Sequence, residues 1–333
     1  MHDKLQSDAL TAMADIDANG GKTGFWRKTP ESAALLAFLL AEIIFFSLSS
    51  PYFLTWGNWV NVITALSITG VLAAGGTMLL IAGQFDLSVG SGVAFVALVM
   101  ALTVDSIGIV PASALALLVG MGIGVINGFL VTKIGVNALI TTLGTLAIFR
   151  GLTQSIGGGK NMLISNFDWA IWRPFFNIPL SALVFVLVAI VVGLVLKRTV
   201  FGRSIYAIGA NENAARLVGI KTKRVVFLSF LLSGAFIGLG GLMSASQLGS
   251  TSGTTGIGLE LAVVTAVILG GTSLKGGTGT MFGTVIGLLI VGVLNNGLTL
   301  MNINSSWQQA ATGFLLILAV SFDQLRQRLV GRR

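Results

Sequence analysis

Long apolar stretches, separated by short polar or glycine-containing turns, make up most of this chain. A helix needs roughly 20 apolar residues to cross about 30 Å of hydrocarbon. Stretches that approach this length lie at residues 33–50, 60–82, 86–104, 110–131, 137–152, 179–196, 225–247, 259–272, 281–301 and 307–322. The pattern therefore predicts an all-α integral membrane protein with about ten transmembrane helices.

Two of these stretches, 137–152 and 259–272, are shorter than the others. A short apolar segment is typical of a broken or re-entrant helix. Such a helix is tolerated in a membrane only where protein or a water-filled cavity covers its backbone. We expect some of the ten helices to be short or broken in this way.

Two short motifs occur in both halves of the chain. Gly124-Val-Ile-Asn-Gly128 resembles Gly292-Val-Leu-Asn-Asn-Gly297, and Asp86-Leu-Ser-Val resembles Glu260-Leu-Ala-Val. On the predicted topology, the paired helices run in opposite directions. The matches indicate a candidate inverted repeat, which is common in transporters. Matches this short also arise by chance in a sequence rich in glycine, valine and leucine.

The composition agrees with a lipid environment. Hydrophobic residues make up 54% of the chain and charged residues only 10%, with a mean hydropathy of +0.91. A soluble domain usually carries about 25% charged residues. The 44 glycines also suit close packing of membrane helices, which associate through small residues.

The distribution of positive charge orients the chain, because loops on the cytoplasmic side of a membrane are rich in lysine and arginine. With both termini in the cytoplasm, only Arg150, Lys160 and Arg173 of the 20 lysines and arginines fall outside. The inner loop 197–224 alone holds seven of them: Lys197, Arg198, Arg203, Arg216, Lys221, Lys223 and Arg224. The asymmetry also accounts for the net charge of +8 without a nucleic-acid partner.

This orientation divides the chain into three parts. We expect a polar cytoplasmic tail at residues 1–32, a transmembrane domain at residues 33–322 and a basic cytoplasmic tail at residues 323–333. The first tail lacks the apolar core of a signal peptide.

Several chemistries are disfavoured by the residues present. The chain has no cysteine, and its one histidine is His2, so we expect no histidine or cysteine metal site and no catalytic pair. A phosphate-binding loop needs a glycine, four residues and then Gly-Lys-Ser/Thr. Gly21-Lys22-Thr23 has Ile16 where the first glycine belongs, and Gly159-Lys160 precedes Asn161. We therefore expect no cofactor and no nucleotide site in this chain.

The loop 197–224 predicts a short helix of its own. Asn211 suits an N-cap, Glu212 suits the first turn, and Gly219 suits the position after the helix end. A two-turn helix is not stable alone in water. It therefore packs either on its own membrane domain or into a cleft on a soluble partner.

The motifs of this loop and of several others resemble those of one family. They are Gly202-Arg203, Ala207-Ile208-Gly209, Asn211, Ala214-Ala215, Gly219-Ile220, Asp86-Leu-Ser-Val-Gly90, Gly270-Gly271-Thr-Ser and Gly276-Gly277-Thr-Gly279. The chain resembles the permeases of ribose-type ABC sugar importers over residues 35–322. Branched-chain amino acid permeases have a similar loop, but the stretch after Phe85 resembles the sugar group. Gln84-Phe85 depart from the family pattern.

The resemblance implies a permease in the bacterial inner membrane that moves a pentose, a hexose or a polyol. A cytoplasmic ATP-binding subunit would grip the coupling loop, a periplasmic sugar-binding protein would deliver substrate, and a second permease copy would complete the pathway. The implied coupling residues are Gly209, Asn211, Glu212, Ala214, Ala215, Arg216, Gly219 and Ile220.

Five polar residues in or beside the apolar segments are candidates for lining the pathway: Asp86, Ser88, Asn127, Glu260 and Asn295. Carboxylates and amides bond sugar hydroxyls well. Helix capping by the two acids and bonding between helices by the asparagines are the alternatives.

Other functions remain open at this stage. An ion-coupled secondary transporter is the alternative, but such proteins need acidic sites near the midplane, and only Glu42 is central. A membrane enzyme lacks a catalytic set here. The outer tryptophans Trp169 and Trp172 suit interfacial anchoring or a sugar platform, and the loop 249–258 suits a linker or an outer gate.

Overall fold

The structure, a computed structural model, describes residues 31–330. Helices occupy all ten predicted segments. Their bounds are α2 (Glu31–Ser49), α3 (Trp56–Ile81), α4 (Val89–Ile107), α5 (Ile109–Phe129), α6 (Ala138–Ile156), α7 (Leu180–Arg198), α10 (Thr222–Leu248), α11 (Leu259–Leu269), α12 (Met281–Leu300) and α13 (Ser305–Val330). The expectation of an all-α membrane protein is thus confirmed.

Shorter elements connect these helices. A π-helical turn, η2 (Leu130–Ile134), extends α5, and α8 (Val200–Ala210) and α9 (Glu212–Leu217) separate α7 from α10. The 3₁₀ turn η3 (Trp169–Ile171) lies between α6 and α7. The two-residue strands β1 (Met162–Leu163) and β2 (Ser250–Thr251) pair antiparallel.

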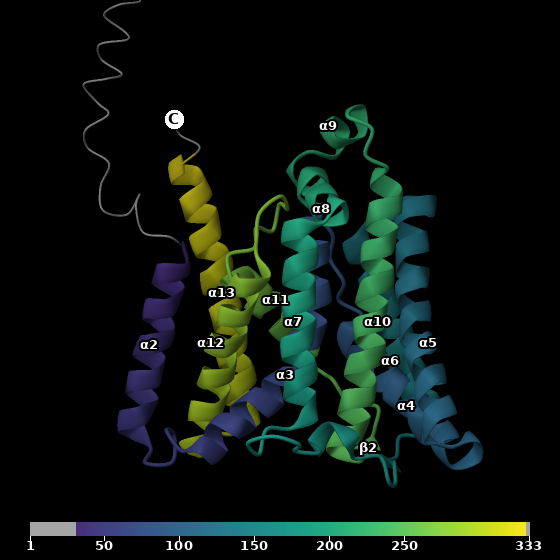
Figure 1. Cartoon of the computed structure of the whole chain (residues 1–333), viewed down its shortest axis with the longest axis vertical. Helices are drawn as coiled ribbons and strands as arrows, with labels where there is room; N and C mark the ends of the chain where they lie inside the picture. The colour runs from purple at the N-terminus through teal and green to yellow at the C-terminus, as the bar shows by residue number, and fades with distance from the viewer. Residues whose placement is uncertain (1–30, 331–333) are drawn as a thin grey trace, which may run out of the picture.

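The long helices stand side by side, with α8 and α9 at one end of the bundle and β2 at the other (Figure 1). We call these the α9 end and the β2 end. Among the described residues, six helical segments are long and apolar enough to cross a membrane by themselves: α3, α4, α5 with η2, α7, α10 and α12. Helix α11 is too short, with 11 residues, and lies against α12, α13 and α3.

Glycine allows the two most closely packed helices, α5 and α10, to touch through their backbones. A Cβ added to Gly124 would meet the carbonyl oxygen of Phe230 and lie 2.9 Å from the Cα of Gly234. A Cβ on Gly120 would meet the Cα of Gly238. These four glycines let the helices approach without side chains between them, which is how many membrane helices associate.

The chain is interrupted twice inside the bundle. Residues 82–88 have no regular helix, and the turn into them uses Gly83 at φ +73°. The second interruption, residues 270–280, follows α11. The segment 137–152, predicted to be short, lies in the continuous 19-residue helix α6, which runs past the predicted end to Ile156. Its buried threonines, Thr141, Thr142 and Thr145, make this helix less apolar than its neighbours.

The packing repeats between the two halves of the chain. Helix α10 packs on α5 and α4, while α3 packs on α12 and α11. Likewise α4 packs on α6, and α11 packs on α13. Equivalent helices α5 and α12 run in opposite directions (Figure 1). The units α3–α6 and α10–α13 are thus arranged as an inverted repeat, as the paired motifs indicate.

Candidate functional site

The short helix α9 begins and ends where its sequence predicts. The side chain of Asn211, the N-cap, accepts a hydrogen bond from the N–H of Ala214 at 3.0 Å. At the other end Gly219 has φ +86°. The N–H of Ile220 donates to Ala215, and the N–H of Gly219 donates to Arg216, both at 3.1 Å. This pair of bonds is a Schellman motif.

The two faces of α9 differ. Ala215 is buried, with 3% of its surface exposed, in a cluster with Leu79, Ile208 and Phe230. Ala214 is exposed, and at the end of the helix Leu217 and Val218 are 90% and 77% exposed. One face of α9 is therefore fixed to the membrane domain, and the other presents apolar side chains to water. We call Ala214, Leu217 and Val218 the α9 tip.

The charged side chains of α9 make one ion pair within the helix and one hydrogen bond to α10. Glu212 pairs with Arg216 at 2.8 Å and accepts a hydrogen bond from Thr222 of α10 at 3.1 Å. Both charged residues are about half exposed, so the pair is worth only about 0.3–0.5 kcal/mol. All seven basic residues of the loop 197–224 are exposed. The α9 end therefore carries a positively charged surface.

Helix α8, between α7 and α9, is an element that the sequence analysis did not predict. Thr199 caps it by accepting from the N–H of Gly202 at 3.0 Å. Its buried face includes Ile205 and Ile208. The spacing of three positions between Ile205 and Ile208, with exposed Arg203 on the other side, is the signal that could have revealed an amphipathic helix. Gly209 lies on α8, not on α9.

Three of the five candidate pathway residues join one buried hydrogen-bonded network. The carboxylate of Asp86 accepts from the N–H of Ser88 at 3.0 Å and from its hydroxyl at 2.5 Å. Asn127 of α5 donates to the Ser88 hydroxyl at 2.9 Å and accepts from Thr145 of α6 at 2.9 Å. Ser233 of α10 donates to Asp86 at 3.0 Å. We call these five residues the Asp86 network.

The network ties the interruption 82–88 to α5, α6 and α10. Asp86 is 6% exposed, and Ser88 and Asn127 are fully buried. Ser233 and Thr145, which complete the network, were missed because nothing in their sequence context distinguishes them from other membrane serines and threonines. A role for Asp86, Ser88 and Asn127 in lining an open pathway stays a prediction.

The other two candidates lie outside this network. Glu260 of α11 accepts a weak hydrogen bond from the N–H of Gly258 at 3.2 Å, and its second oxygen lies against Gly90 at the start of α4. Asn295 of α12 is 3.5 Å from the hydroxyl of Thr312 on α13. The alternative of helix capping was wrong in detail, since the N-caps are Ser88 for α4 and Gly258 for α11.

Arg150 of α6 holds the loop 249–258 at the β2 end. Its guanidinium donates to the carbonyl oxygen of Gly253 at 2.9 Å and to that of Thr255 at 2.6 Å. The charge pattern predicts that Arg150 lies outside, and it assigns this residue no role. The loop is therefore anchored to the bundle by a charged group on α6.

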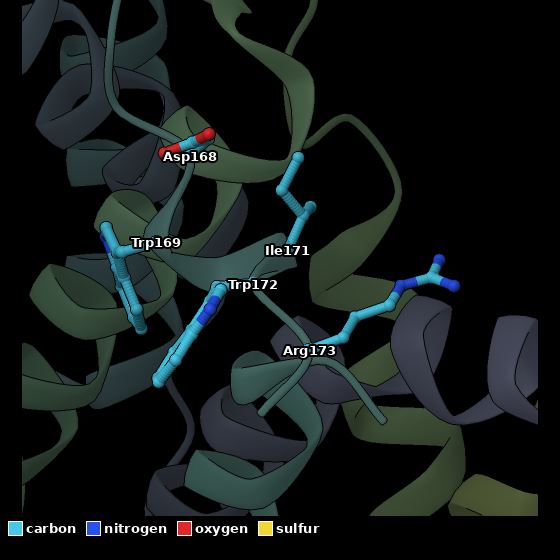
Figure 2. Close-up of a pocket in the computed structure, with 5 residues that line it drawn as sticks. All are labelled: Asp168, Trp169, Ile171, Trp172 and Arg173. Carbon is cyan, nitrogen blue, oxygen red and sulfur yellow. The ribbon is translucent and has the colours of Figure 1, made fainter. Parts of the chain in front are cut away.

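A shallow pocket at the β2 end is lined by Asp168, Trp169, Ile171, Trp172 and Arg173. Figure 2 shows the two indole rings extending to one side of the segment, with Ile171 and Arg173 on the other. Trp169 stacks edge-to-face on Phe167, while Trp172 is 62% exposed. Both interfacial anchoring and a sugar platform remain compatible with this geometry.

Among residues 31–330, no three acidic or histidine side chains gather closely enough to hold a metal ion. Among the side chains that the structure describes, the acidic ones in the membrane region are dispersed over α2, α4, α11 and the 82–88 interruption.

Comparison with known proteins places the chain among permeases. Residues 58–320 match the family described as "Branched-chain amino acid transport system / permease component". The chain is 39% identical over 291 residues to the ribose import permease protein of Bacillus subtilis (strain 168), which covers 86% of this chain and 90% of that protein.

Two further relatives come from Escherichia coli (strain K12). The L-arabinose transport system permease protein is 38% identical over 291 residues, covering 84% of this chain and 86% of that protein. The D-allose transport system permease protein is 36% identical over 306 residues, covering 90% and 93%. No solved structure matches the chain.

Proposed function

Since this chain belongs to the family of branched-chain amino acid transport system permease components, we propose that it is the permease subunit of an ATP-binding cassette importer that moves a sugar across the bacterial inner membrane. Six helical segments able to span a bilayer and an inverted repeat support a translocation role. The chain itself forms the pathway, and ATP is hydrolysed by a separate subunit.

A sugar is the substrate class that the relatives support. Relatives named for ribose, L-arabinose and D-allose are 36% to 39% identical to the chain over most of its length. The stretch from Asp86 to Gly90, which resembles the sugar group, points to the same class. The substrate is accordingly a pentose or hexose.

The α9 tip is the surface to which the ATP-binding subunit binds, and it is the single observation on which the proposal depends. Leu217 and Val218 stand almost fully exposed on a helix whose opposite face is buried against the membrane domain. Exposed apolar side chains on a rigid, positively charged end are typical of a protein docking site. The positive-inside rule puts this end in the cytoplasm, where ATP is available.

The β2 end faces the periplasm and receives the sugar from a binding protein. Arg150 fixes the loop 249–258 there, and the pocket of Trp169 and Trp172 opens on the same end. A second permease copy, identical or homologous, completes the pathway between the two subunits.

An ion-coupled secondary transporter is less well supported. Such proteins bind their coupling ions at sites near the membrane midplane. In the described part of the chain, the carboxyl groups of Glu42, Asp86 and Glu260 belong to different elements and form no shared ion site. Work for transport therefore comes from ATP.

The proposal is tested by the energy source of uptake. Proteoliposomes are prepared with this chain alone, and with the ATP-binding subunit and sugar-binding protein encoded beside it. Uptake of radiolabelled ribose, arabinose and allose that requires ATP and the complete assembly supports the proposal. Uptake by the lone chain driven by a proton or sodium gradient contradicts it.

A further inference from the structure

The end of α3, the interruption 270–280 and α8 are distant in the sequence but meet in one place. The N–H of Gly277, in the interruption 270–280, donates to the carbonyl oxygen of Ile81 at the end of α3 at 2.8 Å. The hydroxyl of Tyr206 on α8 donates to the carbonyl oxygen of Gly279 at 2.8 Å. These bonds join α8 to the interruption 270–280. They also join that interruption to the end of α3, where the interruption 82–88 begins. We call this contact region the α8 junction.

Gly209 brings the backbones of the junction together. A Cβ added to Gly209 would meet both the carbonyl oxygen of Ile81 and the backbone nitrogen of Gly277. A Cβ on Gly276 would lie 3.0 Å from the Cα of Gly209 and 2.9 Å from the nitrogen of Gly83. No larger residue fits at Gly209 unless backbone moves, because real Cβ atoms do not approach other heavy atoms this closely.

The junction connects the α9 tip to both interruptions without a flexible linker. Only Asn211 separates α8 from α9, and it is engaged as the N-cap of α9. Ile208 of α8 and Ala215 of α9 share one buried cluster. A displacement of the tip is therefore carried by α8 as a packed unit, since tightly packed elements shift between discrete arrangements rather than deform.

The hydroxyl of Tyr206 is suited to this role. The side chain is partly buried, and burial raises the pKa of the Tyr206 hydroxyl above its ordinary value, so the phenol is protonated at neutral pH as any tyrosine is. Its acceptor is a backbone carbonyl in a turn that uses positive φ at Gly276, Gly277 and Gly279. Glycine adopts such positive φ values without the steric cost that other residues would meet.

We propose that Tyr206 and Gly209 are positioning residues for transport, which tie α8 to the interruptions 82–88 and 270–280 so that movement of the α9 tip shifts both together and opens the inner end of the pathway. This inference rests on the proposed function, because it assigns the force on α9 to an ATP-binding subunit. Neither residue belongs to the α9 tip, so their effect lies in coupling rather than in docking.

The test compares uptake per ATP hydrolysed in the complete assembly. Tyr206→Phe removes only the donated hydrogen bond, and Gly209→Ala adds one methyl group between two backbones. Tyr52→Phe and Gly57→Ala are matched controls, because Tyr52 is exposed and a Cβ at Gly57 meets nothing within 4 Å. We expect uptake per ATP to fall about fivefold for Tyr206→Phe and about tenfold or more for Gly209→Ala. The ATP-binding subunit should still co-purify with both.

A second measurement reports on the exposure of the turn in the interruption 270–280. The chain has no cysteine, so a single Lys275→Cys reports on this exposed position without background. We expect its rate of maleimide labelling to differ about fivefold or more between the nucleotide-free and ATP-trapped assemblies. Addition of Gly209→Ala should remove the difference.

The possible outcomes distinguish failure of the α8 junction from failure of the proposed function. Uptake per ATP equal to the native value in both variants, with an unchanged Lys275→Cys response, overturns the α8 junction and leaves the proposed function standing. Absence of ATP-dependent uptake in the native assembly overturns the proposed function and this inference with it.

Discussion

The carboxylate of Asp86 accepts a hydrogen bond from the hydroxyl of Ser233 at 3.0 Å, although 147 positions separate the two residues in the chain. This bond holds the interruption 82–88 against α10. It is one of three contacts that satisfy a carboxylate with no cationic partner among the described residues. The interruption between α3 and α4 thus has a defined position.

Substitution of Asp86 tests whether hydrogen bonding, rather than charge, fixes this segment. Asp86→Asn keeps an oxygen for Ser88 and offers Ser233 an amide, so we expect near-native stability. Asp86→Leu leaves the N–H and hydroxyl of Ser88 without their acceptor, at a cost of about 1–3 kcal/mol for each unpaired group. Thermal unfolding in detergent measures the difference. Asp105→Leu, at an exposed position of α4, is the control, and equal loss in Asn and Leu variants would contradict the account.

The glycine contact between α5 and α10 gives a second prediction with a control on the same helix. Gly124→Ala places a methyl group against the carbonyl of Phe230 and should destabilise the protein by about 1–3 kcal/mol through overpacking. Gly122→Ala faces open space and should be neutral or slightly stabilising, because alanine favours helix. Resistance to unfolding by heat or by sodium dodecyl sulfate reports both effects. Equal stability of the two variants would show that these backbones do not touch.

Arg150 gives a third prediction, about the loop 249–258. Hydrogen bonds from a charged donor are worth about 1.5–3 kcal/mol each, and Arg150→Met removes two of them. We expect a single Thr254→Cys to react with a membrane-impermeant maleimide about tenfold faster in this background. Arg173→Met is the control, since exposed Arg173 donates a hydrogen bond to Asn177 in its own loop and none to the loop 249–258. A reaction rate unaffected by Arg150→Met would mean that the loop is held by other contacts.

Hydropathy and charge predict much of this fold, because each membrane helix is specified by its own apolar run. Asn211 and Gly219 likewise predict α9, since capping is local in the sequence. The Asp86 network, the α8 junction and the Arg150 anchor could not be predicted. Each joins residues from distant parts of the chain, and a serine such as Ser233 has no local feature that reveals its partner.

The α9 tip and the buried residue beside it give a fourth prediction. Ala215 is buried against the membrane domain, so its replacement by a charged residue should reduce stability as well as coupling. Leu217→Asp and Val218→Asp change only exposed positions, and we expect each to weaken co-purification of the ATP-binding subunit about tenfold or more, as for buried apolar contacts in interfaces. Leu163→Asp, 77% exposed near the β2 end, is the control. Full retention of the subunit by both tip variants would remove the docking role of α9.

The central claim is that the α9 tip lies in the cytoplasm and is covered there by an ATP-binding subunit. Labelling of a single Val218→Cys with a membrane-impermeant maleimide tests it most directly, because the chain contains no other cysteine. We predict labelling in inside-out vesicles, protection when the ATP-binding subunit is bound, and no labelling of intact spheroplasts. Labelling of Val218→Cys from the outside of spheroplasts, or equal labelling with and without the bound subunit, would contradict the account.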